Sequence, residues 1–417
     1  MTDRRSDTGW LLTLCCSQIF IMLVFINYSA ILPVLKAEWG MSNTQAGVIF
    51  SVYQLGYIVS GVLLSSLSDR LNIRWIFICA ALWSGIANLL FALYAHDYLS
   101  GLLLRGITGI GMGGTYMPGL KLVAERFASH QRGRAVGIYV GSLVLGASLS
   151  LVVPGTITGI WGWRIAMTVC SIGVFAGAAL SLLVFRGYRP PAPQPSPKGF
   201  SGEILHNRPA LLVILGYASH MWEMYGMRSW LAPFFTAALT GWGISSGKAT
   251  AVAAAIAAAL VGIGAFSTAV TGSLSDRFGR TATVSVVMLG SVTCSLSFGW
   301  LINTNLWLTL AVGVCYGWLI VAESPVFSTA LTELVAPGYL GTAMGMQSLV
   351  GYTMGMISPT VFGWALDRFQ DWQPFTGVHG AWGIAFTTVG LGGLFGPLCM
   401  WLLRKEPAAR KMAQGRR

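Results

Sequence analysis

The sequence predicts an all-α membrane protein whose twelve transmembrane helices form two pseudo-symmetric bundles of six. Three observations lead to this prediction. Of the 417 residues, 54% are apolar and only 10% are charged, whereas an ordinary soluble protein carries about 25% charged residues. Apolar runs long enough to cross about 30 Å of hydrocarbon follow one another along the chain. Features of the first half also recur in the second half.

The apolar runs are expected to form helices and not strands. A helix needs roughly 20 apolar residues to cross a bilayer, whereas membrane β-strands are about ten residues long and alternate in polarity. The stretch AVAAAIAAALVGIGAF at 251–266 does not alternate, and a soluble helical protein would carry polar helix faces that raise its charged fraction. The expected spans are 11–34, 45–67, 75–95, 98–122, 136–158, 165–185, 209–236, 249–273, 281–302, 306–329, 341–363 and 381–403.

The basic residues are distributed by membrane side, which accounts for the net charge of +12 without a nucleic-acid partner. With the N-terminus placed inside, twenty of the 26 Lys and Arg residues fall in cytoplasmic segments, as the positive-inside rule requires. The first apolar run is long enough to be a span, so we expect no cleavable signal peptide. These features predict a multi-pass protein of the cell inner membrane with both termini in the cytoplasm. The basic residues of the outer loops are Lys36, Arg164, Lys248 and Arg368.

A polar, proline-rich segment separates the sixth span from the seventh. Five prolines lie between Pro190 and Pro197, and such a sequence behaves as an extended tether and cannot form a membrane helix. The chain is therefore expected to have four parts. They are an N-terminal six-helix bundle at 1–186, a cytoplasmic linker at 187–208, a C-terminal six-helix bundle at 209–403 and a basic cytoplasmic tail at 404–417.

The two halves repeat at a nearly constant spacing. Asp69 and Asp276 are 207 residues apart and lie in similar loops. At an offset of 208 residues, Glu125 matches Glu333, and two pairs of glycines match in the same segment. Several matches in the same order indicate a duplicated six-helix unit.

Two loops carry the most distinctive pattern of the sequence. The loop at 272–280 reads GSLSDRFGR, and its weaker copy at 65–74 reads SSLSDRLNIR. With Arg105 in the fourth span, these loops make the chain resemble a member of the major facilitator superfamily over essentially its whole length. The resemblance implies two bundles that rock about a central site and a latch that joins them on the cytoplasmic side. The residues of this latch would be Asp69, Arg70, Gly272, Asp276, Arg277 and Arg280.

The chemistry of the second loop suits such a latch. Asp276 can accept charge-assisted hydrogen bonds from arginines and from the N-terminus of a neighbouring helix. Gly272 and Gly279 would allow close backbone approach and a tight turn. The alternative is that Arg277 and Arg280 only anchor the ordinary topology, which requires neither the aspartate nor the glycines.

Five ionisable side chains are expected inside the membrane, where each costs at least ~2.5 kcal/mol on insertion scales. Such a residue needs either a function or a partner. All five fall in the fourth, seventh and tenth spans, and the resemblance implies that these spans line a central cavity. The five residues are Arg105, His220, Glu223, Arg228 and Glu323.

His220 and Glu223 are three residues apart in the seventh span and hence neighbours on one helix face. We interpret Glu223 as a group that takes up and releases a proton, because burial raises the pKa of a carboxyl group toward neutrality. The alternative is a structural pair with His220 or with an arginine from another helix. Arg228 or Arg105 would attract an anionic or polar solute, and the alternative for Arg228 is snorkelling to the outer interface.

Glu323 lies two residues before Pro325, which frees a backbone carbonyl in the tenth span. At the repeat offset of 208 it matches Thr115, so the acid occurs in one half only. A substrate or proton site would show this asymmetry, whereas an architectural residue would be expected in both halves. Other residues that could line the cavity, or serve only in packing, are Asn27, Tyr28, Tyr53, Gln54, Trp222, Gln347 and Tyr352.

Other chemistries find no support in the sequence. The seven cysteines lie in apolar stretches, and no His and Cys cluster has the spacing of metal ligands. No Walker-type sequence is present, and the glycines of GIGMGG at 109–114 lack the preceding strand of a dinucleotide site, so we expect them to permit close helix packing. We therefore expect no enzyme activity, no metal, no cofactor and a monomer.

These observations predict a secondary active transporter that moves a small polar or anionic organic solute by alternating access, coupled to a proton or another ion. One alternative is a proton-driven drug exporter, but the fifth span, GSLVLGASLS at 141–150, lacks the G-P-x-x-G-G element of such exporters. Another alternative is a non-transporting solute sensor, which the short cytoplasmic loops disfavour. A lipid translocator is a third alternative.

Overall fold

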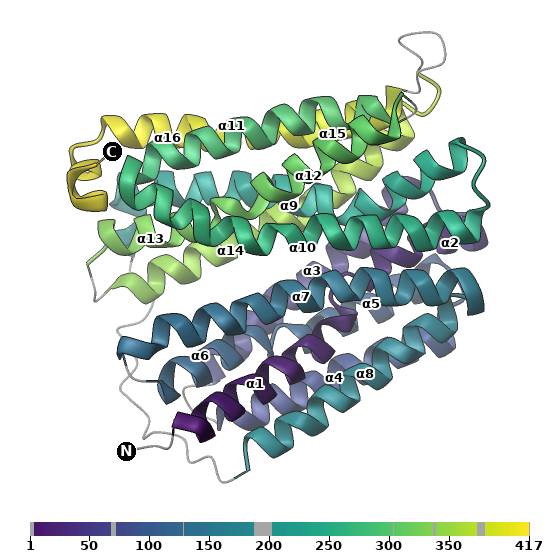
Figure 1. Cartoon of the computed structure of the whole chain (residues 1–417), viewed down its shortest axis with the longest axis horizontal. Coiled ribbons are helices and arrows are strands. Elements are labelled where there is room, and N and C mark those ends of the chain that lie inside the picture. Colours follow the sequence, from purple (N-terminus) through teal and green to yellow (C-terminus); the bar gives the residue numbers. More distant parts are fainter. Residues whose placement is uncertain are drawn as a thin grey trace. The chain divides into compact units, whose positions relative to one another are not determined.

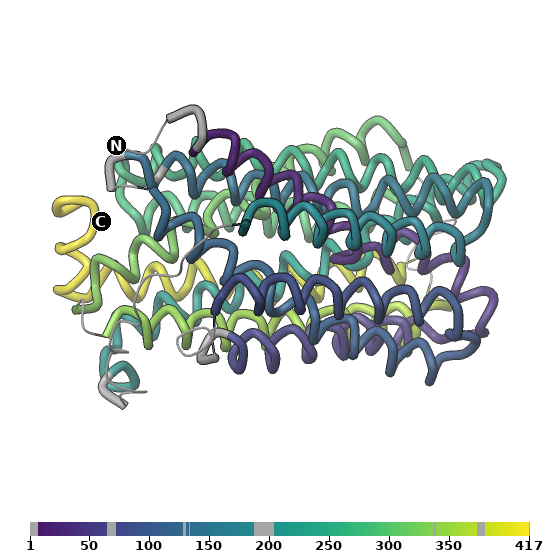
Figure 2. Tube along the Cα trace, turned by 90° about the horizontal axis from the view of Figure 1, so that it is seen from below, coloured from purple at the N-terminus to yellow at the C-terminus, as the bar shows by residue number. Residues whose placement is uncertain are grey.

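The computed structural model shows a chain built from helices. Within the described part of the chain, every long element is an α-helix and no strand occurs. Long helices lie side by side in both views of the backbone (Figures 1 and 2), which confirms the all-α prediction. The structure describes residues 4–67, 72–127, 129–186, 202–302, 304–336, 339–372 and 380–416.

The helices account for the twelve expected crossings. Ten helical segments of the described residues are long and apolar enough to span a membrane. Two further segments complete the twelve: α9 (Arg208–Gly241), and α5 (Tyr98–Met112) together with α6 (Tyr116–Arg126). Ionisable residues in the middle of α9 lower its hydropathy, and a turn interrupts the pair formed by α5 and α6.

Packing divides the chain into two compact units, and each unit includes a short piece of the other sequence half. Unit 1 comprises Met1–Met41, Val48–Gln194 and Leu231–Gly262, and unit 2 comprises Ser42–Gly47, Pro195–Trp230 and Ile263–Arg417. Most of the expected linker at 187–208 lies outside the described residues. The division into bundles at 1–186 and 209–403 therefore stays a prediction.

The first sequence half supplies most of unit 1, in which α4 packs against α5 and α8, and α1 packs against α7 and α8. Buried hydroxyl groups join these helices: Ser17 Oγ of α1 donates to the backbone oxygen of Gly177 in α8 at 2.8 Å. The remaining helices of this half are α1 (Arg4–Ile21), η1 (Met22–Val24), α2 (Asn27–Trp39), α3 (Asn43–Leu67), α4 (Ile73–Tyr94), α7 (Ser129–Trp161) and α8 (Trp163–Val184).

Close packing in unit 1 depends on the glycines of α5. A Cβ atom at Gly109 would collide with the backbone of Tyr53 in α3, and one at Gly111 would collide with Ser84 in α4. Only a residue without a side chain allows the backbones to approach this closely. The prediction that the glycines of 109–114 serve helix packing is confirmed.

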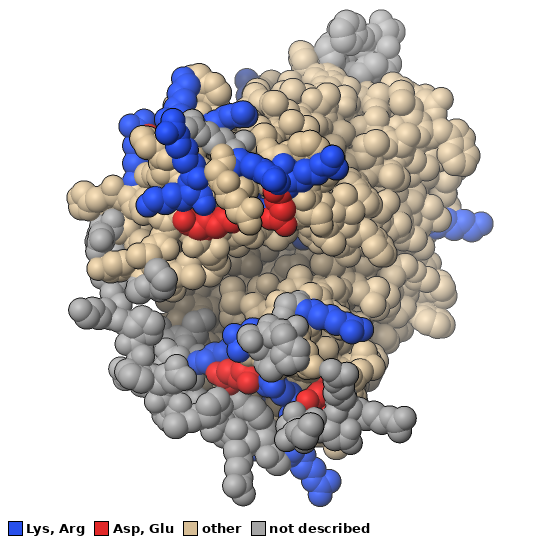
Figure 3. All heavy atoms as spheres, turned by 60° about the vertical axis from the view of Figure 1, so that its left-hand side comes forward, with Lys and Arg blue, Asp and Glu red and all other residues tan. Residues whose placement is uncertain are grey.

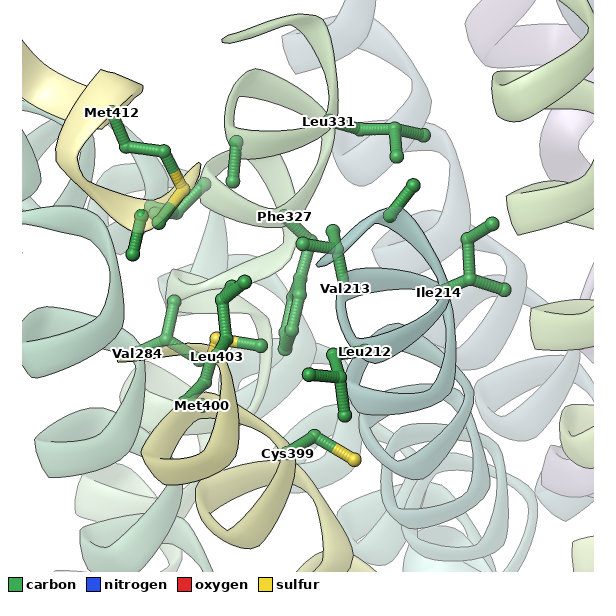
Figure 4. Packing of buried hydrophobic residues seen from close by; sticks show 14 of the residues in the cluster. Leu212, Val213, Ile214, Val284, Phe327, Leu331, Cys399, Met400, Leu403 and Met412 are labelled. Atoms are coloured by element: carbon green, nitrogen blue, oxygen red, sulfur yellow. The ribbon is translucent and has the colours of Figure 1, made fainter. Parts of the chain in front are cut away.

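The second sequence half supplies most of unit 2, in which α11 packs against α12, α15 and α16. A hydrophobic cluster fills the C-terminal end of this unit (Figure 4), and Phe327, Met400, Leu403 and Met412 each expose at most 1% of their surface there. The helices are η2 (Gly202–His206), α10 (Ser246–Phe278), α11 (Arg280–Phe298), η3 (Gly299–Leu301), α12 (Leu306–Ala322), α13 (Ser324–Leu334), α14 (Leu340–Arg368), α15 (Gly380–Gly393), α16 (Phe395–Lys405) and η5 (Pro407–Gly415).

The tail predicted at 404–417 continues α16 and forms η5, whose Met412 lies in this cluster. The basic side chains of the tail remain exposed around it. Figure 3, in which the C-terminal end comes forward, shows Lys and Arg side chains gathered on that face. The exposed basic residues of the tail include Arg404, Lys405, Arg410, Lys411 and Arg416.

The interrupted spans occupy matching positions in the two halves. The N-cap residue of α6 is Thr115, and the N-cap residue of α13 is Glu323. These two residues are the pair that the sequence repeat aligns at an offset of 208. The fourth and tenth spans therefore break at equivalent points, and only the second break carries an acid.

Candidate functional site

Arg105 lies in the middle of α5 and is the most deeply buried arginine of the five candidate residues, with 1% of its surface exposed. Its Nη1 donates hydrogen bonds to Oδ1 of Asn27 at 3.0 Å and to Oδ1 of Asn88 at 3.4 Å. Asn88 Nδ2 donates in turn to the backbone oxygen of Met167 at 3.0 Å and to the hydroxyl of Ser171 at 2.9 Å. These bonds hold the Asn88 amide with its oxygen toward the guanidinium.

Aromatic rings surround the rest of the Arg105 guanidinium. Its Cζ lies 4.5 Å from the ring centroid of Tyr53, 5.7 Å from that of Tyr28 and 6.0 Å from that of Phe91. Such cation–π contacts are strongest where water is excluded. Among the described residues, no carboxylate forms an ion pair with Arg105, and its Nε has no hydrogen-bond partner.

The surroundings of Arg105 therefore suit an anion. A buried cation is costly unless other groups compensate its charge. The amide oxygens and ring faces around Arg105 carry only partial negative charge. A carboxylate, sulfonate or phosphate that reached the guanidinium would supply a full negative charge and could accept paired hydrogen bonds from it.

His220 of α9 and Glu323, at the break between α12 and α13, form a buried pair in unit 2. His220 Nδ1 and Glu323 Oε1 lie 2.7 Å apart, and both side chains are completely buried. The rings of Tyr217 and Phe327 lie 5.7 and 6.2 Å from the His220 ring. His220 Nε2 and Glu323 Oε2 have no hydrogen-bond partner among the described residues.

Glu223 occupies a different environment in unit 2, although it is only three residues from His220. Its Oε1 accepts a hydrogen bond from the hydroxyl of Ser291 in α11 at 2.7 Å. Its Oε2 faces Gly393 at the end of α15, where a Cβ atom would lie 2.6 Å from that oxygen. The structural partners expected for Glu223 were His220 or an arginine, and within the described ranges neither bonds to it.

Arg228 lies further along α9 and is only half-buried. Within the described part of the chain it forms no ion pair, and its Nε has no hydrogen-bond partner. Partial exposure permits either of the predicted interpretations, solute attraction or snorkelling. Arg228 is therefore a weaker candidate than Arg105 for a buried anion site.

Two of the predicted latch residues, Asp276 and Arg280, belong to a network of ion pairs within unit 2. Arg280 Nη1 donates to Asp276 Oδ1 at 2.6 Å, and Arg280 Nη2 donates to Glu333 Oε1 at 2.8 Å. Glu333 Oε2 also accepts from the backbone N–H of Ala413 in η5 at 3.2 Å. Asp69 and Arg70 lie outside the described residues. The expected latch between the two bundles therefore stays a prediction.

The remaining residues of the GSLSDRFGR loop differ in their surroundings. Gly279 has φ +94°, so it makes the tight turn expected of it. At Gly272, no described atom lies within 4 Å of the position of a Cβ, so the close approach expected there is not found. Arg277 is exposed and lies over the ring of Phe278, 5.3 Å from its centroid.

The residues proposed to line the cavity separate into two groups. Asn27, Tyr28 and Tyr53 contact Arg105. Within the described ranges, the other proposed residues form no hydrogen bond or ring contact with Arg105. They are Gln54, which is buried, Trp222, whose carbonyl accepts from Ser358, Gln347, which donates to Ser328, and Tyr352, which packs on Tyr225.

Asn88 is a residue of the Arg105 site that sequence reasoning missed. It is the only side-chain amide in the third expected span, 75–95. That isolation is a signal, because an amide in an apolar span must find a partner in another helix. The identity of the partner could not be inferred, since it depends on how α4 is rotated toward α2 and α5.

Comparison with known proteins agrees with this architecture. A family model described as the Major Facilitator Superfamily matches residues 14–359. A relative from Cupriavidus pinatubonensis named "Probable 4-methylmuconolactone transporter" is 25% identical over 349 residues, which cover 79% of this chain and 76% of the relative. A relative from Cupriavidus necator named "Probable sulfoacetate transporter SauU" is 24% identical over 407 residues, which cover 90% of this chain and 91% of the relative.

Solved structures show the same fold. A crystal structure of a bacterial homolog of the human lysosomal transporter Spinster, in an inward-facing and occupied conformation, matches with a TM-score of 0.79 at 17% identity. The match covers 97% of this chain and 98% of that chain. Because the family model spans most of the sequence and the folds agree, this multi-pass membrane protein belongs to the Major Facilitator Superfamily.

Proposed function

We propose that this protein is a secondary active transporter that moves a small organic anion across the cell inner membrane by alternating access, coupled to protons. The observation that carries the proposal is the environment of Arg105. Its guanidinium is buried among amide oxygens and aromatic rings, and no described carboxylate neutralises it. A site of this kind favours a solute that brings its own negative charge.

The names of two relatives support an anionic solute. One is named for sulfoacetate and the other for 4-methylmuconolactone. Sulfoacetate carries a carboxylate and a sulfonate, and guanidinium groups bind such oxyanions through paired hydrogen bonds. We therefore choose small carboxylates and sulfonates as the first compounds to test.

Proton coupling is proposed to use Glu323 and His220. His220 Nδ1 and Glu323 Oε1 lie 2.7 Å apart, and the second nitrogen of His220 and the second oxygen of Glu323 have no partner among the described residues and so could accept or donate a proton. Glu323 also sits at a helix break, where the backbone oxygen accepts from Val326 N at 2.9 Å and the geometry can change locally. Glu223, bonded to Ser291, is the second candidate for the coupling proton.

The proposed orientation places both termini in the cytoplasm. The exposed basic residues of the C-terminal tail and the positive-inside distribution of Lys and Arg support this orientation. In the proposed cycle, the anion binds Arg105 in unit 1, and the proton binds the Glu323 and His220 pair in unit 2. The energy of the proton gradient then supports accumulation of the anion.

The proposal is tested by uptake into proteoliposomes with an imposed pH gradient, using sulfoacetate, other small carboxylates, an uncharged sugar and a cationic dye. We expect uptake of one or more of the anions and none of the dye. Arg105→Gln should reduce anion uptake by at least about thirtyfold, because loss of a buried charged partner costs more than about 2 kcal/mol. Arg105→Lys keeps the charge but loses the paired geometry, so we expect it to lie between Arg105→Gln and the wild type.

Arg228→Gln is the matched control, since Arg228 is an intramembrane arginine that is only half-buried. It should reduce uptake less than Arg105→Gln does, because Arg228 is the weaker candidate for the anion. Equal loss in the Arg105 and Arg228 variants would contradict the assignment of the anion to Arg105. Export of the dye without anion uptake would favour a drug exporter instead.

A further inference from the structure

Asp367, in the last turn of α14, holds the first turn of α3. Its Oδ1 accepts hydrogen bonds from Asn43 N at 2.9 Å and from Asn43 Nδ2 at 2.7 Å. Its Oδ2 accepts from Thr44 N at 2.7 Å and from Thr44 Oγ1 at 2.6 Å. One carboxylate therefore receives four hydrogen bonds from two consecutive residues that are more than 300 positions away in the sequence.

This contact has the chemistry of a helix cap supplied by another helix. The first N–H groups of an α-helix have no partner within the helix, and the N-terminus of a helix attracts negative charge. α3 begins at Asn43. Asp367 satisfies the N–H groups of Asn43 and Thr44 and adds a full negative charge at the helix N-terminus, which a water molecule could not do.

The helices are also packed closely around this cap. A Cβ atom at Gly47 of α3 would collide with the backbone of Pro359 in α14, and one at Gly363 would collide with the backbone of Asn43. Trp230 Nε1 donates to the backbone oxygen of Pro359 at 3.0 Å. The absence of a side chain at Gly47 and at Gly363 therefore allows the backbones of α3 and α14 to pack in close contact next to the Asp367 cap.

The two helices belong to different halves of the repeat. α3 lies in the first six-span half, whereas α14 lies in the second. Any rocking motion that draws these helix ends apart must break all four hydrogen bonds to Asp367. By the proposed topology these ends face outward, because an odd number of crossings separates each from the nearer chain terminus.

We propose that Asp367 is a gating residue that fastens α3 to α14 at the outer end of the protein and releases it once in each transport cycle. This inference rests on the proposed alternating-access mechanism. When the cap is intact, the outer ends of α3 and α14 stay together. When Asp367 is changed, the equilibrium shifts toward the state in which these ends are apart.

Amide hydrogen exchange measured by mass spectrometry on the purified full chain tests the cap directly. In Asp367→Asn, the peptide that contains Asn43–Gly47 should exchange at least about threefold faster than in the wild type, in line with the loss of a charged helix cap. Asp371→Asn is the matched control, since Asp371 is exposed and forms no hydrogen bond or ion pair among the described residues. It should leave this peptide unchanged.

Thr44→Val provides a second variant that keeps the carboxylate and removes only the bond from Thr44 Oγ1. We expect a smaller rise in exchange of the same peptide. If Asp367→Asn and Thr44→Val both left exchange unchanged, the cap would have no role in holding the helix end. A rise spread equally over all helices would show general destabilisation and would also overturn the inference.

Labelling at Ser42→Cys with a membrane-impermeant thiol reagent tests the gate in the membrane. Added to Asp367→Asn, this cysteine should be labelled several-fold faster than in the otherwise unchanged protein. Neither measurement depends on the identity of the solute. Failure of anion uptake would therefore contradict the proposed function alone, whereas equal labelling rates would contradict the gate alone.

Discussion

Arg105 and Glu323 are both fully buried, but their environments differ in chemistry. Arg105 is surrounded by amide oxygens and ring faces, with no described acid beside it. Glu323 has a titratable partner, His220, at 2.7 Å. A cation without a counter-charge suits the binding of an anion, whereas a carboxylate beside an imidazole suits the exchange of a proton. The proposed roles of Arg105 and Glu323 therefore rest on their partners and not on burial alone.

Glu323→Gln should uncouple transport from the proton gradient. The amide keeps the shape of the side chain and can still bond to His220, but it cannot take up or release a proton. We expect gradient-driven accumulation of the anion in proteoliposomes to be lost, while exchange of labelled for unlabelled anion at equal pH continues. His220 should remain a hydrogen-bond partner, so the melting temperature should change little.

Glu223→Gln is the matched variant, because Glu223 is equally buried but bonds to Ser291. We expect it to retain accumulation, since glutamine can still accept the Ser291 hydrogen bond. Loss of accumulation in Glu223→Gln with normal accumulation in Glu323→Gln would move the coupling proton to Glu223.

At the scale of helices, small residues decide how closely the backbones approach. Gly109 and Gly111 of α5 leave no room for a Cβ atom against α3 and α4. Other helical glycines have open space, as Gly137 of α7 does. Some helical glycines are therefore needed for close packing between helices, whereas others could carry a side chain without a collision. Only the contacts between helices distinguish the two kinds of position.

Gly109→Ala should destabilise the protein, because its Cβ would overlap the backbone of Tyr53 and α5 would have to move. Overpacking of this kind costs roughly 1–3 kcal/mol. We expect a clear fall in the melting temperature, measured by tryptophan fluorescence of the purified protein. Anion uptake should also be reduced, because Arg105 lies on the displaced helix.

Gly137→Ala serves as the control for this measurement. Its Cβ meets nothing within 4 Å, and alanine favours a helix over glycine by up to about 1 kcal/mol. The melting temperature should stay the same or rise. A fall as large as that of Gly109→Ala would show that sensitivity to glycine substitution is general and not a matter of close packing.

The tail adds a second element-scale feature, because η5 is docked on unit 2 by both apolar and polar contacts. Met412 is buried in the hydrophobic cluster of Figure 4, and the Ala413 N–H donates to Glu333. Glu333 also binds Arg280 of the GSLSDRFGR loop. The tail and this loop are therefore joined through one carboxylate.

For the whole molecule, the number of crossings decides which loops face which side. α9 and the pair of α5 and α6 are the two predicted crossings that length and hydropathy alone do not identify as membrane spans. The family match and the structural likeness support twelve crossings. A direct test should therefore use positions on both sides of each of these segments.

Single cysteines at His96 and Arg134 flank α5 and α6, and those at His206 and Lys248 flank α9. In whole cells, we expect a membrane-impermeant thiol reagent to label His96→Cys and Lys248→Cys but not Arg134→Cys or His206→Cys. All seven native cysteines are free and would first be replaced. Permeabilised cells, in which all four should react, provide the control. Equal labelling of both positions of a pair would show that the intervening segment does not cross.

The amino-acid sequence alone establishes the membrane character, the repeat and the intramembrane charges that need an explanation. These features are local, because hydropathy and the cost of burying a charge can be evaluated within about 20 residues. Arg105 and Glu323 are conspicuous for this reason, since each is an ionisable residue within an apolar span. The repeat also pairs Thr115 with Glu323, the two positions at which the fourth and tenth spans break.

Which groups meet depends on how whole helices rotate and cross. His220 faces Glu323 and Glu223 faces Ser291, although the two α9 residues are three positions apart. Asn88 turns its oxygen toward Arg105, and Asp367 caps a helix from the other half. These partners lie between 17 and 324 positions apart in the chain. Spacing within one helix does not reveal such pairs, so they became apparent only in the tertiary structure.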